Sequence, residues 1–422
     1  MNQATSPSRI AVIGGGVVGM TIALALQRQG HTVSVLDPRG PGEGASYGNA
    51  GFLATELIDP LSTLATLRKA PRLWLDPHGA LALPLRYLPR LVSWLGRFIA
   101  AARPARATKG RQALAALNGV SVAAWKRCLA EIGAEEELLA SGYLLVWEST
   151  RGRVAAKAQM EHLQRWGYEV EWLEAAEIRA REPGLAGKLS HGLYFPGAHQ
   201  VRDPHALVRR LAEVFEARGG GLCWTSVSRL EPRDEGVRLH TDAGQRDVDR
   251  AVVAAGAWSH YLAESLGLEV PLETERGYHL TLPTRGEALC QPVGSAERHC
   301  VMTPMSCGLR VVGFTELGGL TLPPRARRYA SLRHHVQALL CDSANLDDGA
   351  EEWMGFRPTL PDSLPVIDRH PDHSQIFFAF GHQHLGLTQA AITAELMGAL
   401  VGERAPAIDL SPYRITRFMN GS

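Results

Sequence analysis

The feature of this sequence that most constrains its fold is a glycine-rich loop between two predicted strands near the start of the chain. Residues 9–13 (RIAVI) are a short β-branched run and residues 31–36 (HTVSVL) are another, and both predict buried strands. Residues 17–29 between them have helical spacing and end at Gly30, which favours a helix C-terminus. The order strand, helix, strand predicts a βαβ unit and an α/β fold of the Rossmann type.

The loop itself matches the G-x-G-x-x-G pattern of dinucleotide-binding folds. Its glycines allow a tight turn, the approach of phosphates to the backbone, and close packing of the helix on the sheet, while the helix N-terminus attracts the pyrophosphate. Asp37 ends the second strand, where a carboxylate can accept ribose hydroxyls and repels the 2′-phosphate of NADP. The loop residues expected at this site are Gly14, Gly16, Val17, Val18 and Gly19.

Composition narrows the class of protein. The chain has 422 residues, which favours two domains, and its net charge of +1 gives no indication of nucleic-acid binding. The six cysteines form no CxxC pair, so neither a disulfide framework nor a metal site is predicted. The polar segment 1–8 does not resemble a signal peptide, and no run of 18 apolar residues is present, so a cytoplasmic location is expected.

The elements expected farther along the chain indicate two interleaved domains. Strands are predicted at 142–148, 221–227, 237–240, 250–254, 276–282, 300–303, 309–314 and 376–380. Residues 56–140 are predicted to be mostly helical, with more helices at 151–166, 175–181, 204–218 (capped by Asp203) and 386–401. We expect a discontinuous FAD-binding domain from residues 1–57, 195–262 and 345–422, and an antiparallel-sheet substrate domain from 58–194 and 263–344.

The glycine loop alone does not distinguish FAD from NAD, but three later segments favour FAD. Residues 44–51 suit a loop close to a flat ring, residues 250–259 are a strand that runs into a small-residue turn, and residues 381–388 open a helix whose N-terminus can stabilise negative charge on a reduced flavin. An ordinary surface loop and a simple strand end remain the alternatives for the first two. Further cofactor contacts are expected from Ser46, Asn49, Ala50, Gly51, Val227, Gly256, Trp258, Gly355, Gly381, Gly386, Leu387 and Thr388.

In order, these segments, together with residues 276–278 (RGY) and 355–358 (GFRP), resemble the D-amino acid oxidase-like superfamily. The likeness covers nearly the whole chain and is strongest to bacterial D-amino acid dehydrogenases and glycine/sarcosine oxidases. It implies FAD-dependent oxidation of a small D-amino acid or cyclic imino acid, by hydride transfer from the α-carbon to flavin N5, which gives an imine. Electrons would then pass to a quinone, another carrier or oxygen.

The resemblance also implies roles for Arg357 and Tyr278, and a departure from the family pattern suggests one for His384. Arg357 would bind the substrate carboxylate through its two-pronged guanidinium, held in a turn by its neighbours Gly355 and Pro358; a structural arginine paired with a buried acid is the alternative. Tyr278 would line the pocket over the flavin unless it is a core residue. His384 stands where relatives have small residues and would recognise a polar substituent, as in a hydroxy-D-proline.

Several alternatives remain. Members with covalently attached flavin use a cysteine after the arginine motif or a histidine near the serine loop; this chain has residues 359–360 (TL) and 47–48 (YG) there, which predicts non-covalent FAD. A glycine/sarcosine-type oxidase, an FAD-binding subunit of a hetero-oligomeric amine dehydrogenase, and an NAD-dependent dehydrogenase are the rival functions. Residues 81–106 combine apolar and arginine side chains, which predicts either peripheral contact with an anionic membrane or a helix packed on the substrate domain.

Overall fold

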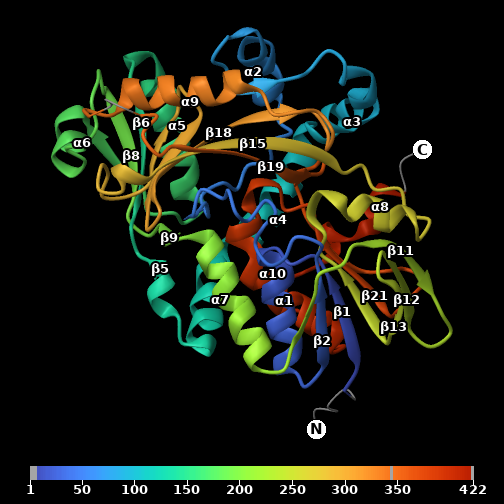
Figure 1. Ribbon diagram of the computed structural model, residues 1–422. Helices are drawn as coiled ribbons and strands as arrows, with labels where there is room; N and C mark the ends of the chain where they lie inside the picture. The colour runs from blue at the N-terminus through green and yellow to red at the C-terminus, as the bar shows by residue number, and fades with distance from the viewer. Residues whose placement is uncertain (1–6, 343–345, 420–422) are drawn as a thin grey trace.

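The computed structural model describes residues 7–342 and 346–419. A mainly parallel sheet forms its lower half in Figure 1, with the strand order β10-β2-β1-β14-β21-β20. Only β20 runs antiparallel to its neighbour, at one edge. The strands are β1 (Arg9–Ile13), β2 (Thr32–Leu36), β10 (Gly221–Cys223), β14 (Arg250–Val253), β20 (Val366–Arg369) and β21 (Ile376–Phe380).

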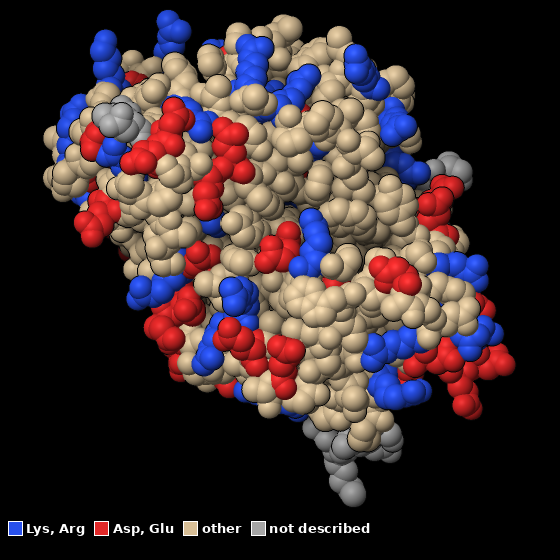
Figure 2. All heavy atoms as spheres, in the orientation of Figure 1, with Lys and Arg blue, Asp and Glu red and all other residues tan. Residues whose placement is uncertain are grey.

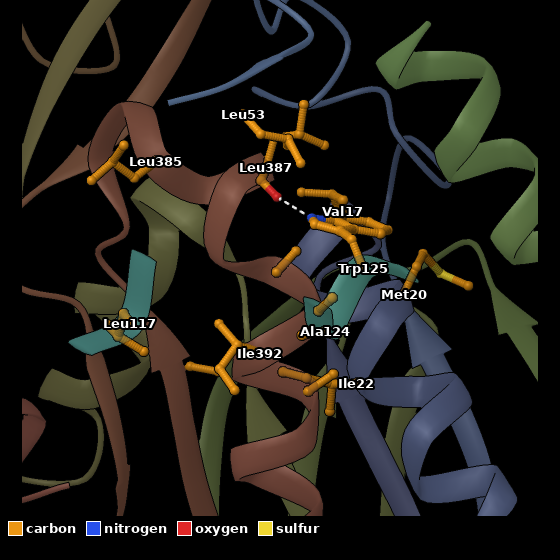
Figure 3. Close-up of a cluster of buried hydrophobic side chains, with 14 of the residues drawn as sticks. Val17, Met20, Ile22, Leu53, Leu117, Ala124, Trp125, Leu385, Leu387 and Ile392 are labelled. Carbon is orange, nitrogen blue, oxygen red and sulfur yellow. Dashed lines mark hydrogen bonds between the residues drawn. The ribbon is translucent and has the colours of Figure 1, made fainter. Parts of the chain in front are cut away.

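Helices α1 (Val17–Arg28) and α10 (Gly386–Val401) pack against each other, and the long α4 (Pro104–Ile132) packs on α10. Figure 3 shows their shared apolar core, which includes Val17 and Met20 of α1 and Ile392 of α10. Trp125 of α4 lies within it and donates a hydrogen bond of 2.8 Å to the Leu387 carbonyl. Since Val17 begins α1 and Leu387 lies in the first turn of α10, this core holds both helix N-termini beside each other.

The second sheet lies above the first in Figure 1 and is mainly antiparallel, with the order β19-β15-β18-β17-β16-β6-β8-β7. Helix α9 (Ala326–Leu339) packs on β15 and β18 and covers the upper face. The strands are β4 (Leu81–Ala82), which pairs with β18, β6 (Tyr143–Trp147), β7 (Glu171–Glu174), β8 (His191–Phe195), β15 (Glu273–Leu282), β16 (Val293–Ser295), β17 (Cys300–Met305), β18 (Gly308–Leu317) and β19 (Glu351–Thr359).

Two smaller sheets and further helices complete the fold. One small sheet contains β11 (Val227–Pro232), β12 (Val237–Thr241) and β13 (Gly244–Val248), and the other contains β3 (Phe52–Leu53), β9 (His199–Val201) and β5 (Leu138–Leu139). The other α-helices are α2 (Leu64–Leu75), α3 (Leu88–Ala101), α5 (Arg153–Arg165), α6 (Ala175–Arg181), α7 (Pro204–Ala217) and α8 (Ser259–Glu264). In the described residues, no helix is both long and apolar enough to cross a membrane.

Most predicted elements are confirmed, including the opening βαβ unit and the cap of α7, where the Asp203 carboxylate accepts from the His205 and Ala206 amides. The predicted strand 221–227 is confirmed only at its start, because β10 ends at Cys223 and Val227 begins β11 in a different sheet. Strand β19 belongs to the upper sheet, although we predicted residues 345–422 to lie wholly in the FAD-binding domain. The predicted boundary at 344/345 and the start of segment 1–8 lie outside the described residues.

Candidate functional site

A cavity of about 1480 Å³ is lined by residues of both large sheets. Its lower wall includes the first turn of α1 and the start of α10, and its upper wall includes strands β15, β18 and β19. In the described residues, no group of three or more His, Cys, Asp or Glu side chains is arranged to hold a metal ion.

The glycine loop at the lower wall is folded so closely that side chains are excluded. Gly14 has φ +110°, and a Cβ there would collide with the Ala254 carbonyl of the neighbouring strand end. A Cβ at Gly19 would collide with the Gly14 carbonyl, so this glycine is required for helix α1 to pack on the loop. The loop thus leaves backbone, not side chains, at the cavity wall.

Polar groups around this loop match the requirements of a dinucleotide. The Ser46 hydroxyl accepts a hydrogen bond of 2.9 Å from the Val17 amide, whereas the Val18 amide has no acceptor among the described residues. Such a free N–H at a helix N-terminus suits a phosphate oxygen. The Asp37 carboxylate accepts from the Gly15 and Arg39 amides at 2.8 and 2.9 Å and also lines the cavity, so its remaining lone pairs can accept ribose hydroxyls.

Most residues predicted to contact the cofactor lie on the cavity wall: Gly14, Gly16, Val17, Val18, Asp37, Ser46, Asn49, Ala50, Val227, Gly256, Trp258, Gly355, Gly386 and Leu387. Gly19, Gly51, Gly381 and Thr388 are not among its lining residues. Gly51 and Gly381 adopt φ values of +71° and +85°, so they shape turns behind the wall. The Thr388 hydroxyl accepts from the Ala54 amide at 3.1 Å and joins α10 to the segment after β3.

Arg357 lies at the opposite wall, on β19, and not in the turn that we predicted. The register pairs it with Glu275 of β15, and its Nη1 donates to Glu275 Oε1 at 2.8 Å and to the Phe314 carbonyl at 3.0 Å. Its guanidinium crosses Gly277, where a Cβ would collide with Arg357 Cζ. Nε and Nη2 have no partner among the described residues. One edge of the guanidinium is therefore fixed and two nitrogens remain available to a ligand.

The alternative interpretation of Arg357, a structural arginine paired with a buried acid, also has support, because the acid is present. Glu275 is 2% exposed and lines the cavity, and it also accepts hydrogen bonds from the hydroxyls of Thr315 (2.7 Å) and Thr359 (3.2 Å). Burial alone would raise the pKa of the Glu275 carboxyl, but the charge of Arg357 and the Thr315 hydrogen bond hold the pKa below its ordinary value. Glu275 is thus an ionised support for Arg357.

His384 also lines the cavity, close enough to Glu275 and Arg357 to interact with both charges. Burial is the main cause that lowers the pKa of its imidazole, so the ring is neutral at physiological pH. No hydrogen bond joins its ring to another of the described residues. A neutral imidazole offers one donor and one acceptor, which suits a hydroxyl or amine of a ligand.

The prediction that Tyr278 lines the pocket is wrong. Its side chain is fully buried on the other face of β15, where it packs edge-on against Tyr329 of α9 with ring centroids 5.3 Å apart. Its hydroxyl donates to Glu316 at 3.3 Å. Because side chains alternate along a strand, Gly277 and Glu275 take the cavity face and Tyr278 cannot. The next residue, His279, points away from Tyr278, and its Nδ1 lies 3.3 Å from the Gly48 carbonyl oxygen.

Sequence reasoning missed Glu275, Gly277, Phe314 and Thr315, all of which line the cavity. The motif at 276–278 lies on the strand that lines the cavity, but we chose Tyr278 as the lining residue, whereas Gly277 is the one that lines it. The period-two alternation through residues 273–282 was a usable signal, since it places Glu275 and Gly277 on one face. Choosing that face required knowing that Arg357 lies on the paired strand.

Comparison with known proteins decides the family. The family model described as FAD dependent oxidoreductase (DAO) matches residues 9–400. The chain belongs to the DAO family of FAD-dependent oxidoreductases. This confirms the resemblance drawn from the sequence motifs and makes FAD the cofactor, which the glycine loop, the free Val18 amide and Asp37 fit.

This oxidoreductase is 34% identical over 419 residues to a D-amino-acid oxidase of Bradyrhizobium diazoefficiens, across 97% of this chain and 99% of the relative. It is 33% identical over 437 residues to D-amino acid dehydrogenase 2 of Ralstonia nicotianae, across 97% of this chain and 100% of the relative. Among solved structures, glycine oxidase from Geobacillus kaustophilus matches with a TM-score of 0.73 and 24% identity, across 98% of this chain and 99% of that one. That structure supports the fold.

Proposed function

We propose that this enzyme oxidises a small D-amino acid or cyclic imino acid, with D-proline or a hydroxy-D-proline as the favoured type. The observation that carries the proposal is the guanidinium of Arg357, which faces the cavity with Nε and Nη2 unpaired. Two parallel N–H donors match a carboxylate. The D configuration is supported by the two relatives, which are named for D-amino acids.

The residues of this chain then orient the substrate. Arg357 holds the carboxylate, Glu275 and Gly277 fix the guanidinium, and His384 lies beside them to bind a polar substituent. FAD, non-covalently bound, supplies an acceptor for the α-hydrogen and its two electrons. The substrate nitrogen loses one proton to solvent as the C=N bond forms, and the imine hydrolyses or, if cyclic, persists.

Anaerobic flavin bleaching across a substrate panel tests this proposal. We expect D-proline, hydroxy-D-proline and D-alanine to bleach the flavin faster than their L enantiomers, glycine or sarcosine. Bleaching by glycine and sarcosine alone would replace the proposal with the glycine/sarcosine-type oxidase. No bleaching by any amine would favour the subunit of a hetero-oligomeric dehydrogenase.

Replacing His384 with alanine tests the substituent that this enzyme recognises. We expect His384→Ala to lower kcat/KM for hydroxy-D-proline about tenfold relative to D-proline, because one hydrogen bond to a substrate hydroxyl is lost in a buried site. The kcat/KM values for the two substrates are measured with one enzyme preparation, so differences in flavin content cancel in their ratio. An unchanged ratio would show that His384 does not bind the substrate hydroxyl.

We also propose that electrons leave to a membrane quinone, with the enzyme cytoplasmic and docked on the inner face of the plasma membrane through α2 and α3. These helices expose Leu75 (77%), Val92 (68%) and Ile99 (56%). Figure 2 shows basic side chains along the upper edge of the molecule, where Figure 1 places α2 and α3. Between residues 60 and 110, Asp76 is the only acid, beside Arg68, Lys69, Arg72, Arg86, Arg90, Arg97, Arg103, Arg106 and Lys109.

Vesicle flotation tests this docking. We expect the holoenzyme to float with vesicles that contain anionic lipids and to remain at the bottom with neutral vesicles, because apolar insertion and charge attraction act together. Val92→Glu is expected to abolish flotation, while the same change at Val154, an 83% exposed residue on α5, is the matched control. Absence of flotation with anionic vesicles would remove the membrane proposal and leave oxygen or a water-borne carrier as acceptor.

A further inference from the structure

Strands β15 and β19 carry three matched pairs of residues on the face that borders the cavity. The register joins Glu275 to Arg357, Gly277 to Gly355, and His279 to Trp353. Residues directly opposite each other in an antiparallel ladder point to the same face, so all six share one face of the upper sheet. The first pair is an ion pair, the second has no side chains, and the third is a stack with ring centroids 5.0 Å apart. The proposed function uses the ion pair and assigns nothing to the stacked rings.

The space above the two glycines is occupied from both ends. A Cβ at Gly277 would collide with the Arg357 guanidinium, and the nitrogens nearest to it are Nη2 and Nε, which have no partner among the described residues. A Cβ at Gly355 would collide with the six-membered ring of the Trp353 indole. Directly opposite Cβ positions in a ladder are roughly 5 Å apart. The free donors of Arg357 and the edge of the indole are therefore neighbours on one sheet face.

The Trp353 indole is also held in place on its other sides. A Cβ at Gly48, in the loop 44–51 that we predict to contact the flavin, would collide with the same ring. His279 stacks on the indole, and the Tyr47 ring lies 5.8 Å from it between centroids. Trp353 lines the cavity together with Gly48 and Arg357. The indole thus extends from the loop 44–51 to the arginine as a fixed apolar surface of the cavity wall.

Resting on the proposed function, we propose that Trp353 determines the preference of this enzyme for cyclic imino acids. A carboxylate held by Nε and Nη2 of Arg357 places the ring carbons of a proline-type substrate against the indole. Packing of methylene groups on an aromatic surface removes apolar area from water and so favours the ring. D-Alanine also has a carboxylate and an amine but lacks these ring carbons, so Trp353 contributes little to its binding.

Replacing Trp353 with alanine tests the contact with the substrate ring. We expect Trp353→Ala to lower the ratio of kcat/KM for D-proline to kcat/KM for D-alanine about tenfold, because the additional carbons of proline lose the surface on which they pack. Both values come from one enzyme preparation, so differences in flavin content cancel in their ratio. Equal losses for both substrates, or no loss for either, would overturn the proposal.

The matched control is Trp147→Ala. Trp147 lines the same cavity but lies on β6, which β15, β18, β17 and β16 separate from β19. It also stacks on a histidine, His191, with ring centroids 5.1 Å apart, so the control likewise removes an indole from a ring stack. We expect this variant to keep the wild-type ratio within about twofold, because the two tryptophans are distant and independent. A fall equal to that of Trp353→Ala would show a general loss of packing around the cavity and would count against the proposal.

A methyl group at Gly355 tests the position of the indole without removing it. Gly355→Ala places this methyl group where the indole now lies, so we expect the D-proline to D-alanine ratio to fall although Trp353 is retained. In the double variant Gly355→Ala/Trp353→Ala, the ratio is expected to fall no further than in Trp353→Ala, because the indole that the methyl group would displace is already absent. Additive falls in the double variant would show that ring binding does not depend on the indole.

A binding test needs no turnover. Cyclopentanecarboxylate has a carboxylate on a five-membered ring, as proline does, but no amine, and propanoate is the control without a ring; binding to the holoenzyme is followed by calorimetry. We expect cyclopentanecarboxylate to bind at least about tenfold tighter than propanoate in the wild-type protein and in Trp147→Ala, and this advantage to fall to about threefold or less in Trp353→Ala. Equal binding of both compounds by the wild-type protein would contradict the inference.

These measurements separate the inference from the proposed function. If no amino acid bleaches the flavin but cyclopentanecarboxylate binds through Trp353, the proposed function fails and the ring-binding role of Trp353 stands. If D-amino acids bleach the flavin but neither the D-proline to D-alanine ratio nor the binding of cyclopentanecarboxylate depends on Trp353, the inference fails and the oxidation of small D-amino acids stands.

Discussion

Replacing Arg357 with alanine is expected to lower kcat/KM for the amino acid substrate by about two to three orders of magnitude. The change removes the two free N–H donors that face the cavity and also leaves the Glu275 carboxylate buried without its cation. Truncation of one member of a buried charge pair costs roughly 2–5 kcal/mol, and the expected loss, equivalent to about 3–4 kcal/mol, lies within those bounds. Steady-state kinetics with the best substrate of the bleaching panel measures it, with flavin content as the control for folding.

Two further variants separate carboxylate binding from a purely structural role of Arg357. Arg357→Lys keeps the charge but not the planar fork, so we expect an intermediate loss that falls mainly on KM. Gly277→Ala places a methyl group where the guanidinium now lies, and we expect a similar rise in KM although Arg357 itself is retained. If all three variants lowered only the melting temperature and left KM unchanged, Arg357 would serve the fold and not the substrate.

The sequence predicted Arg357 as a site residue but not its setting. Gly355 and Pro358 are turn signals, whereas the structure has an extended strand. The reason is tertiary: β19 lies at the edge of the upper sheet, and a proline is tolerated there because its missing N–H need not bond to a further strand. Local propensity could not reveal this, since the pairing partner β15 lies about 80 residues earlier in the chain.

Tyr278 and Glu56 illustrate two further limits of predicting site residues from the sequence. The alternation along β15 predicts that Tyr278 and Gly277 face opposite ways, but which face meets the cavity depends on α9, which was not predicted and covers Tyr278. An isolated glutamate such as Glu56 has no motif, and its burial arises only when the segment after β3 is placed against β6. Such side chains can be identified as buried only from the packing of the folded chain.

The dinucleotide site was predictable because its signals are local. The glycines, the helix that follows them and Asp37 lie within one βαβ unit, so the required backbone geometry is encoded in consecutive residues. The later segments were less determinate: Gly51, Gly381 and Thr388 belong to the predicted motifs but support the cavity wall from behind it. Motif spacing predicts which segments lie near a cofactor, and packing decides which residues of those segments line its cavity.

The glycine loop provides the second large expected effect. We expect Gly14→Ala to yield protein with little or no bound flavin and a free energy of unfolding lowered by at least about 2 kcal/mol. An alanine at φ +110° is strained, and its Cβ would collide with the Ala254 carbonyl, so the loop has to move away from the end of β14. Since FAD is predicted to be non-covalent, the flavin-to-protein absorbance ratio after gel filtration reports the loss directly.

The matched control is Gly119→Ala on α4. Gly119 lies within a helix and a Cβ there has nothing within 4 Å, so the same chemical change is expected to retain flavin and to stabilise the protein by about 0.5–1 kcal/mol. Urea unfolding of both variants measures the two free energies. If Gly14→Ala kept full flavin content, the loop would not be the pyrophosphate site, and the cofactor would have to be held by the α10 end of the cavity instead.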